Sequence, residues 1–238
     1  MTPASGLLRL LCLDTSTPTA RVAIVDGAGL PLARAEATAE RHSQNVLRLC
    51  DDVLRAAGLR PAALDALACG AGPGSFTGLR VGLAVVKGLA LATGKPLLLV
   101  SSLEALALDL ARAAPEAPVV VPCIDAGKGE VYAFACVRDA AGALAPGGEP
   151  WRLAPAALAA RLGALTGAVV GGNGADRHAS VLQAAGARRT PVEGPTALSI
   201  AALALRRLAR GEADDLDKAV PFYGRAPDIT APKAPRER

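Results

Sequence analysis

Three apolar runs separated by polar turns occupy the first forty residues. The runs cover residues 7–14, 21–26 and 31–38, with a Thr/Ser/Pro linker and then a Gly-Ala-Gly turn between them. Short apolar runs bounded by turn residues are typical of strands. The pattern therefore predicts a meander of three strands.

Helical spacing then alternates with short apolar runs. Residues 43–58 place their apolar side chains on one face, and the pattern predicts further helices over 79–93 and 103–113 and strands over 65–70 and 97–101. A βββαβα order predicts an α/β fold with a mixed sheet and helices packed on it.

The pattern partly restarts near residue 115. It predicts strands over 119–125, 130–138 and 168–171, a loop over 140–148, and helices over 155–162, 177–185 and 196–209. We therefore expect an N-terminal lobe of residues 1–113 and a smaller C-terminal lobe of residues 114–212. Residues 213–226 are expected to pack back on the first lobe, and residues 231–238 to be disordered.

The helix predicted over residues 79–93 is apolar nearly all round, since Arg80, Lys87 and Thr93 are its only polar residues. Such a helix must be buried on two sides. One side faces the sheet. The other faces either a partner helix or the interior of one large core.

Composition excludes several classes of protein. Hydrophobic residues make up 51% of the chain and charged residues 20%, which is typical of a folded protein. Charges and breakers interrupt every apolar stretch, and the N-terminus lacks a cleavage site, so we expect neither a membrane span nor a signal peptide. The five cysteines form no CxxC pair, and a net charge of +4 does not indicate direct nucleic-acid binding.

A glycine-rich loop over residues 70–78 lies between a predicted strand and a predicted helix. Such loops either bind an anion at the helix N-terminus or form a tight turn. The loop lacks the Lys-Ser/Thr of a P-loop, and no acidic residue follows about 20 positions later, as a dinucleotide site requires. Both remaining interpretations stay open.

Polar residues at two strand ends are candidates for chemistry. Asp14, Thr15 and Ser16 could hold a phosphate or a metal-bound water, or merely satisfy a turn. Asp125 and Glu130 could form an acid–base pair, although turn-flanking acids are commoner. The two histidines, His42 and His178, form no ligand pair.

Several of these segments together resemble the TsaB family, a non-catalytic dimerisation subunit of the bacterial machinery that makes N6-threonylcarbamoyladenosine at position 37 of tRNA. The most specific segment is the Gly-Pro-Gly-Ser-Phe-Thr-Gly-Leu-Arg run of residues 72–80. The others are residues 13–16, 41–44, 81–82, 87–91, 124–132 and 221–225.

The resemblance implies a two-lobed fold of the actin, sugar-kinase and Hsp70 type (ribonuclease H-like βββαβα). It also implies descent shared with TsaD, the catalytic subunit, which holds a metal with a His-x-x-x-His pair. Ser102 and Leu106 stand at those two positions here, and neither can replace a histidine ligand. We therefore expect no catalytic residue and no metal site in this chain.

The resemblance further implies a cytoplasmic scaffold that supports TsaD, with the ATPase TsaE, in threonylcarbamoyl transfer to tRNAs reading ANN codons. It would pair with TsaD through a helical bundle, form a homodimer in isolation, and meet tRNA only through the complex. No cofactor is required, and Asp14, Thr15 and Ser16 would be at most a vestigial site for weak ATP or ADP binding. The expected partner surface comprises Val46, Leu49, Val53, Leu79, Arg80, Gly82, Leu83 and Val86.

Two other functions remain as alternatives. An active phosphotransferase or ATPase of the same fold would use Asp14 for a metal. A glycoprotease-type peptidase would need a metal or nucleophile centre, and the sequence contains no such signature.

Overall fold

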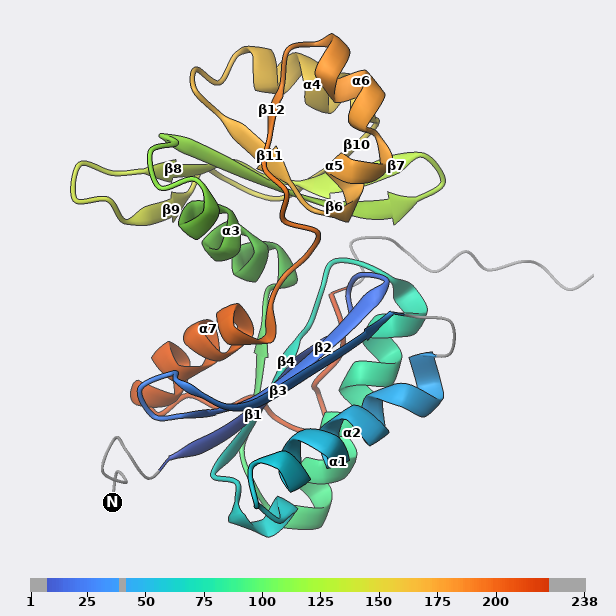
Figure 1. The fold of residues 1–238 in the computed structure, drawn as a ribbon, viewed down its shortest axis with the longest axis vertical. Helices are drawn as coiled ribbons and strands as arrows, with labels where there is room; N and C mark the ends of the chain where they lie inside the picture. The colour runs from blue at the N-terminus through green and yellow to red at the C-terminus, as the bar shows by residue number, and fades with distance from the viewer. Residues whose placement is uncertain (1–7, 39–41, 223–238) are drawn as a thin grey trace, which may run out of the picture.

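A computed structural model describes residues 8–38 and 42–222, except for the side chains of residues 42–45 and 146. Two lobes, each built around one sheet, stack along the long axis of the molecule (Figure 1). The terminal residues 231–238, expected to be disordered, lie outside the described part of the chain, as do residues 223–226.

The first lobe holds a five-stranded sheet in the order β3-β2-β1-β4-β5. β1 pairs antiparallel with β2 and parallel with β4, which makes the sheet mixed, as the βββαβα order predicts. The strands are β1 (Arg9–Asp14), β2 (Thr19–Asp26), β3 (Pro31–Thr38), β4 (Ala66–Gly70) and β5 (Leu97–Val100).

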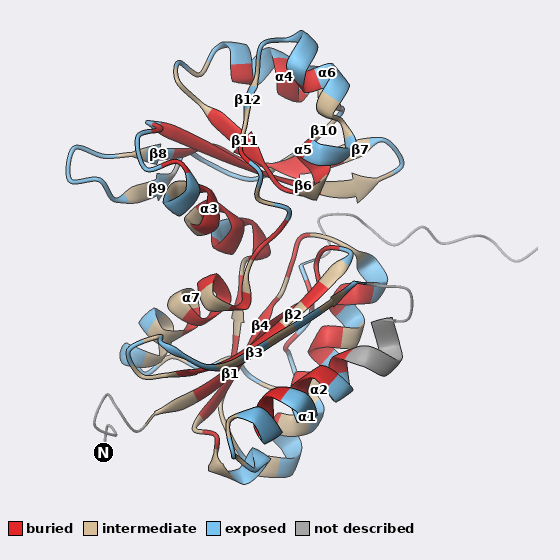
Figure 2. Cartoon of the chain, viewed as in Figure 1, coloured by how far each residue is buried: buried red, intermediate tan, exposed pale blue. Residues whose placement is uncertain are grey.

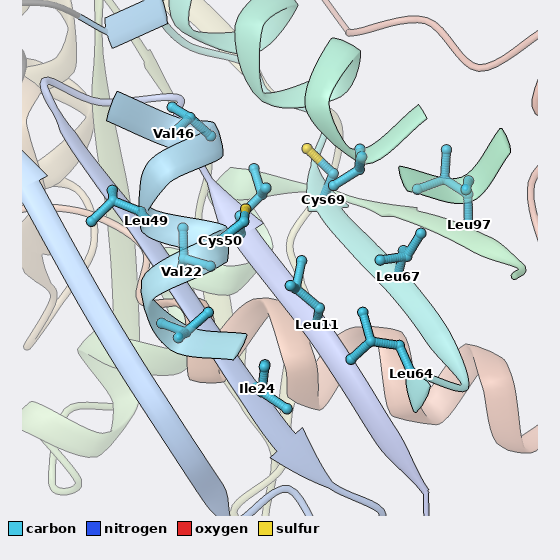
Figure 3. Close-up of a cluster of buried hydrophobic side chains, with 14 of the residues drawn as sticks. Leu11, Val22, Ile24, Val46, Leu49, Cys50, Leu64, Leu67, Cys69 and Leu97 are labelled. Carbon is cyan, nitrogen blue, oxygen red and sulfur yellow. The ribbon is translucent and has the colours of Figure 1, made fainter. Parts of the chain in front are cut away.

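Helices cover both faces of this sheet. α1 (His42–Ala56) and α2 (Phe76–Thr93) lie on one face, α7 (Ala197–Ala209) lies on the other, and the 3₁₀ turn η1 (Pro61–Ala63) precedes β4. Ser75 caps the start of α2 by accepting a hydrogen bond from the Gly78 amide, and Gly94 ends it in the left-handed conformation. Figure 3 shows the apolar side chains that α1, β1, β2 and β4 contribute to the core between sheet and helices.

The second lobe repeats the plan in a smaller form, around a sheet with the path β10-β7-β6-β11-β12. Its strands are β6 (Val119–Gly127), β7 (Glu130–Ala133), β8 (Cys136–Arg138), β9 (Leu144–Pro146), β10 (Trp151–Leu153), β11 (Val169–Gly171) and β12 (Arg188–Arg189). Its helices are α3 (Ser102–Ala113), α4 (Pro155–Gly163), α5 (Asn173–Arg177) and α6 (Ala179–Ala184).

Three predicted elements of this lobe are divided differently in the structure. The strand expected over 130–138 breaks into β7 and β8, which pair with opposite parts of β6. The loop expected over 140–148 contains β9. The helix expected over 177–185 is the shorter α6, which a separate helix, α5, precedes. Pairing with a partner strand decides such short segments, and local patterning does not show it.

α3 and α7 each pack with the lobe opposite to the one that the predicted boundary assigned them to. α3 precedes residue 114, yet its Leu103, Leu106 and Leu110 pack in the core beside β6. α7 precedes residue 212, yet Ile200 and Ala204 pack against β1 and β5 of the first lobe. We therefore propose lobes of residues 8–100 with 197–222, and of residues 102–192.

Residues 212–222, here called the strap, return across the first lobe. Asp214 forms an antiparallel bridge with Leu97 of β5, and the Phe222 amide donates to the Ala71 carbonyl at 2.7 Å. The described part of the segment expected to pack back on the first lobe therefore lies against β5 and the glycine loop.

By length and composition alone, α2 could cross a membrane. Interrupting charges were expected to exclude any such segment, and Arg80 and Lys87 are too few to do so. Core helices pass the same test, and Figure 2 shows buried stretches along α2. Gly82, Val86 and Ala90 are among its buried residues. The apolar character of α2 is thus partly explained by packing within the chain.

Candidate functional site

β1 ends at a buried carboxyl group. Asp14 is 0% exposed, and its Oδ1 accepts hydrogen bonds from the Ser16 amide at 2.9 Å and the Ser16 hydroxyl at 2.6 Å. Its Oδ2 accepts one from the Ser102 hydroxyl at 2.6 Å. Both oxygens are therefore already occupied by groups of the chain itself.

Burial raises the pKa of the Asp14 carboxyl, while the hydrogen bonds from Ser102 and Ser16 act to lower that pKa. Ser102 Oγ also accepts from the Gly72 amide at 3.1 Å. Asp14 and Ser102 thus join β1 to the glycine loop and to the start of α3. Among the described residues, no group of three or more His, Cys, Asp or Glu side chains could hold a metal ion.

The glycines of the loop are explained by close packing. A Cβ atom on Gly74 would lie 2.3 Å from the Ser16 carbonyl oxygen, one on Gly78 would lie 2.1 Å from the Thr15 carbonyl oxygen, and one on Gly82 would lie 2.3 Å from Thr15 Oγ1. The Ser75 amide donates to the Ser16 carbonyl at 2.8 Å. This geometry supports the tight-turn interpretation, because the loop and α2 are pressed against residues 14–17.

Thr15 and Ser16, the other candidate phosphate ligands, are buried beneath the same contact, at 0% and 1% exposure. Thr15 Oγ1 is buried without a hydrogen-bond partner and lies where a side chain at Gly82 would collide with it. The structure therefore brings Asp14, Thr15 and Ser16 together, and places their hydroxyl and carboxylate groups beneath α2 and the glycine loop.

The residues expected to form the partner surface lie mostly inside the chain. Six side chains are less than 9% exposed, and Gly82 faces Thr15; the six are Val46, Leu49, Val53, Leu79, Leu83 and Val86. Only Arg80 is exposed, and its guanidinium stacks on the Phe76 ring at 4.6 Å. Helical spacing correctly predicted that these residues share one face of each helix. That face packs inside the chain, so it is not available as the expected partner surface.

The opposite face of α2 exposes small and apolar residues, and the opposite face of α1 exposes Leu47 among charged residues that form the Arg48–Asp52 and Asp51–Arg55 pairs. Leu47 of α1 is 57% exposed and Leu91 of α2 is 72% exposed, while Ala84 and Gly88 lie on the exposed side of α2. A groove of about 480 Å³ runs between α1, η1 and α2, lined by the charged residues Arg48 and Asp51 and by the apolar residues Leu47, Cys50, Leu54, Pro61 and Leu89. We call this surface the exposed α1–α2 face. Helical spacing alone does not show which face of each helix is exposed.

Gly88 carries the clearest signal on this face. A Cβ atom there would meet nothing within 4 Å, so packing within the chain does not require a glycine. Glycine in an exposed helix interior costs about 1 kcal/mol relative to alanine. Close approach of another helix would explain its presence.

The strand-end acids of the second lobe do not form a catalytic pair. Asp125 pairs with Arg177 at 2.8 Å, and Glu130 pairs with Arg152 at 3.1 Å. His178 Nε2 is buried without a partner, and the side chain of His42 lies outside the described residues. Each acid has a positive partner of its own, as structural ion pairs do.

Polar residues that the sequence did not single out meet between the lobes. Asn173 and Asp176 of α5 and Glu193 line a cavity of about 160 Å³ with Thr17 and Arg21 of the first lobe. Asn173 Oδ1 also accepts from the Asp125 amide at 3.2 Å. These residues come from segments far apart in the chain, so no local motif announces them.

The chain resembles known proteins in sequence. Residues 35–144 match the model of a family described as "TsaD: tRNA N6-adenosine threonylcarbamoyltransferase". The chain is 41% identical over 138 residues to the tRNA threonylcarbamoyladenosine biosynthesis protein TsaB of Haemophilus influenzae, covering 56% of this chain and 55% of that protein. It is 38% identical over 132 residues to the TsaB of Escherichia coli, covering 56% of each. The chain thus spans about half the length of these curated relatives.

Solved structures extend the similarity over the whole fold. YeaZ from Pseudomonas aeruginosa superimposes with a TM-score of 0.77 at 32% identity, over 91% of this chain and 99% of that one. An activator of 2-hydroxyisocaproyl-CoA dehydratase from Clostridium difficile superimposes with a TM-score of 0.52 at 11% identity, over 87% of this chain and 99% of that one, a likeness of fold alone. The fold is thus the expected two-lobed α/β fold of the actin and sugar-kinase type.

Proposed function

The chain belongs to the TsaB (YeaZ) family, and from this premise we propose that it is a non-catalytic scaffold subunit in the biosynthesis of threonylcarbamoyladenosine in tRNA. Its partner in this proposal is a TsaD-type transferase, which it supports together with a TsaE-type ATPase. The proposed location is the cytoplasm, with tRNA met only through the complex and a homodimer formed in isolation.

The observation that carries the proposal is the exposed α1–α2 face. Leu47 of α1 and Ala84, Gly88 and Leu91 of α2 are exposed, and the groove between α1, η1 and α2 is lined mainly by apolar side chains. Small residues let a partner helix approach closely, and larger apolar residues beside them supply area to bury. We therefore place the TsaD-binding surface on this face, in place of the buried face described above.

The two positions that correspond to the metal pair of TsaD have other roles here. Ser102 Oγ connects Asp14 with the Gly72 amide, and Leu106 is 0% exposed in the core of the second lobe. Both side chains serve the fold of this chain, which supports a non-catalytic role.

Association with TsaD tests the surface. Ala84→Glu and Leu91→Glu place a charge on the exposed face without entering the core, so we expect at least about tenfold weaker binding to purified TsaD, measured by calorimetry. Val181→Glu is the matched control, because Val181 is 39% exposed on α6 of the other lobe. Full-strength binding by both variants would remove this face from the proposal.

Reconstitution tests the function itself. We expect threonylcarbamoyl transfer to tRNA by TsaD and TsaE, with ATP, to require this chain, and the chain alone to produce no modified tRNA. Modification that proceeds equally well without it would contradict the scaffold role. Turnover of ATP by the isolated chain, lost in Asp14→Ala, would favour the phosphotransferase alternative.

A further inference from the structure

β5 is the edge strand of the first sheet, and its outer edge is closed by the strap. The outward-facing backbone groups of β5 belong to Leu97 and Leu99, since Leu98 lies between them and strand residues alternate in direction. Three of these groups have partners. The Leu97 carbonyl accepts from the Asp214 amide at 2.8 Å, the Leu99 amide donates to Asp214 Oδ2 at 2.6 Å, and the Leu99 carbonyl accepts from Arg207 Nη1 at 2.6 Å.

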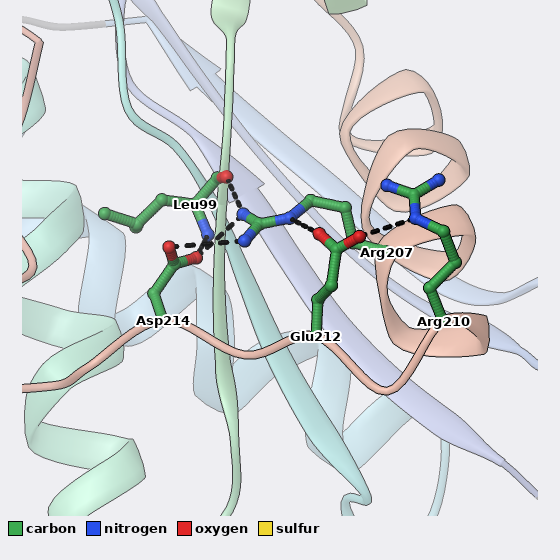
Figure 4. Close-up of polar contacts among 5 residues, drawn as sticks. All are labelled: Leu99, Arg207, Arg210, Glu212 and Asp214. Carbon is green, nitrogen blue, oxygen red and sulfur yellow. Dashed lines mark hydrogen bonds and ion pairs between the residues drawn. The ribbon is translucent and has the colours of Figure 1, made fainter.

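Only one of these three partners is a backbone group. The carboxylate of Asp214 replaces a strand carbonyl and the guanidinium of Arg207 replaces a strand amide, and the two are paired with each other at 2.8 Å (Figure 4). Glu212 accepts from Arg207 Nε at 2.9 Å and so holds the guanidinium from its other side. An ion pair thus takes the place of a sixth strand.

Beyond Asp214, two hydrogen bonds and the buried residues Ala219 and Pro221 hold the strap to the first lobe. The Ala219 carbonyl accepts from Lys87 Nζ at 3.2 Å, and the Phe222 amide donates to the Ala71 carbonyl. Ala219 is buried in the core beneath α2 and Leu216 is partly buried there, while Val220 and Phe222 are 66% and 55% exposed. Segments with little buried apolar area open at lower free energy than the fold as a whole.

We propose that the strap is a latched cover, which opens as one unit when the Arg207–Asp214 pair is released and then exposes the edge of β5 and the glycine loop. In the closed state it protects an unpaired strand edge, which would otherwise template pairing with another chain. The Arg207–Asp214 pair lies near one end of the strap, and the contact between Phe222 and the glycine loop lies at the other end. Opening of the whole strap therefore exposes both the β5 edge and the glycine loop.

Native-state hydrogen exchange of the full chain tests the proposal. In Asp214→Asn the acceptor loses its charge, so we expect the amides of Leu99, Asp214 and Phe222 to exchange at least about tenfold faster than in the wild type, while Leu11 and Leu13 of β1 change by less than about twofold. Lys218→Gln is the matched control, because it removes the exposed Asp215–Lys218 pair in the same strap without touching β5. We expect the control to exchange at the wild-type rate.

Three results would overturn the proposal. The Phe222 amide could stay protected while Leu99 is exposed, which would mean that the strap does not move as a unit. All amides, including those of β1, could accelerate equally, or the Lys218→Gln control could behave like Asp214→Asn. If Asp214→Asn does not fold, Arg207→Lys takes its place and is judged by the same criteria. Lysine keeps the positive charge but lacks the paired N–H donors of the guanidinium, so it weakens the pair with Asp214 less severely.

Discussion

An aspartate at the end of the first strand can either bind a ligand or stabilise the fold, and Asp14 does the second. A carboxylate after the first strand is suited to hold a metal or phosphate, yet here it accepts three hydrogen bonds from Ser16 and Ser102 and is shielded from solvent. Its role in this chain is to connect β1 with α3, and burial raises the pKa of its carboxyl because the charged form is costly to bury.

We expect replacement of Asp14 by asparagine to remove a pH-dependent loss of stability. Burial raises the pKa of this carboxyl above its ordinary value of 3.8, so the folded state holds the proton more tightly than the unfolded state. Wild-type stability therefore falls as the pH rises from that ordinary value through the raised folded pKa, and Asp14→Asn lacks this loss. The urea midpoint of the variant should therefore rise relative to that of the wild type as the pH is raised from about 4, until the Asp14 carboxyl of the folded wild type has ionised.

The matched comparison is Asp125→Asn, since Asp125 has its own arginine partner near the surface. If the Asp14→Asn difference were constant across the whole pH range, Asp14 would not be the residue whose ionisation opposes folding.

Two faces of helix α2 differ in whether a side chain fits at their glycine positions. The face with Gly78 and Gly82 lies so close to residues 13–15 that no side chain fits, whereas the face with Ala84 and Gly88 is open. A nearly uniform apolar composition hides this difference, because apolar residues serve equally well against a sheet and against another subunit.

Two glycine-to-alanine variants separate these faces. Gly82→Ala places a Cβ atom 2.3 Å from Thr15 Oγ1, so we expect a loss of about 1–3 kcal/mol in the free energy of unfolding. Gly88→Ala meets open space, so we expect a gain of about 0.5–1 kcal/mol together with weaker association with TsaD. Denaturant titration and binding calorimetry measure the two effects, and equal stability changes would contradict the assignment of faces.

The two lobes are joined through α3 and α7. Asp109 of α3 accepts from the Thr196 amide at 2.8 Å, from the Thr196 hydroxyl at 2.9 Å and from the Ser199 hydroxyl at 2.7 Å. Arg112 donates to Ser199 Oγ at 2.6 Å. This cluster attaches the start of α7, on the first sheet, to a helix that packs in the second lobe.

Removal of the Asp109 carboxylate should therefore weaken the coupling between the lobes. Asp109→Ala removes the acceptor of the buried Ser199 hydroxyl and of the partly buried Thr196 amide and hydroxyl, so we expect a loss of about 3 kcal/mol and two separable transitions in scanning calorimetry. Asp51→Ala, in an exposed pair with Arg55, should cost less than about 1 kcal/mol and keep the wild-type unfolding profile. An Asp109→Ala profile like that of the control would show that α3 and α7 are coupled by apolar packing alone.

Much of the first lobe could be predicted from local pattern. The strand meander, the helices before and after the glycine loop, and the mixed sheet all follow from apolar spacing and turn residues, because each element there is long enough to show its period. The short strands β8, β9 and β12 could not be predicted in this way, since each depends on a neighbour brought to it by the fold.

The amino-acid sequence by itself determined the α/β class, the family resemblance and the periodic faces of α1 and α2. Only the tertiary structure decided which of those faces is buried, to which lobe α3 and α7 belong, and that Asp14 and Arg207 have their roles within the chain. Spacing along a chain records which side chains share a direction. The direction itself is set by the elements that pack on either side, and these come from distant parts of the sequence.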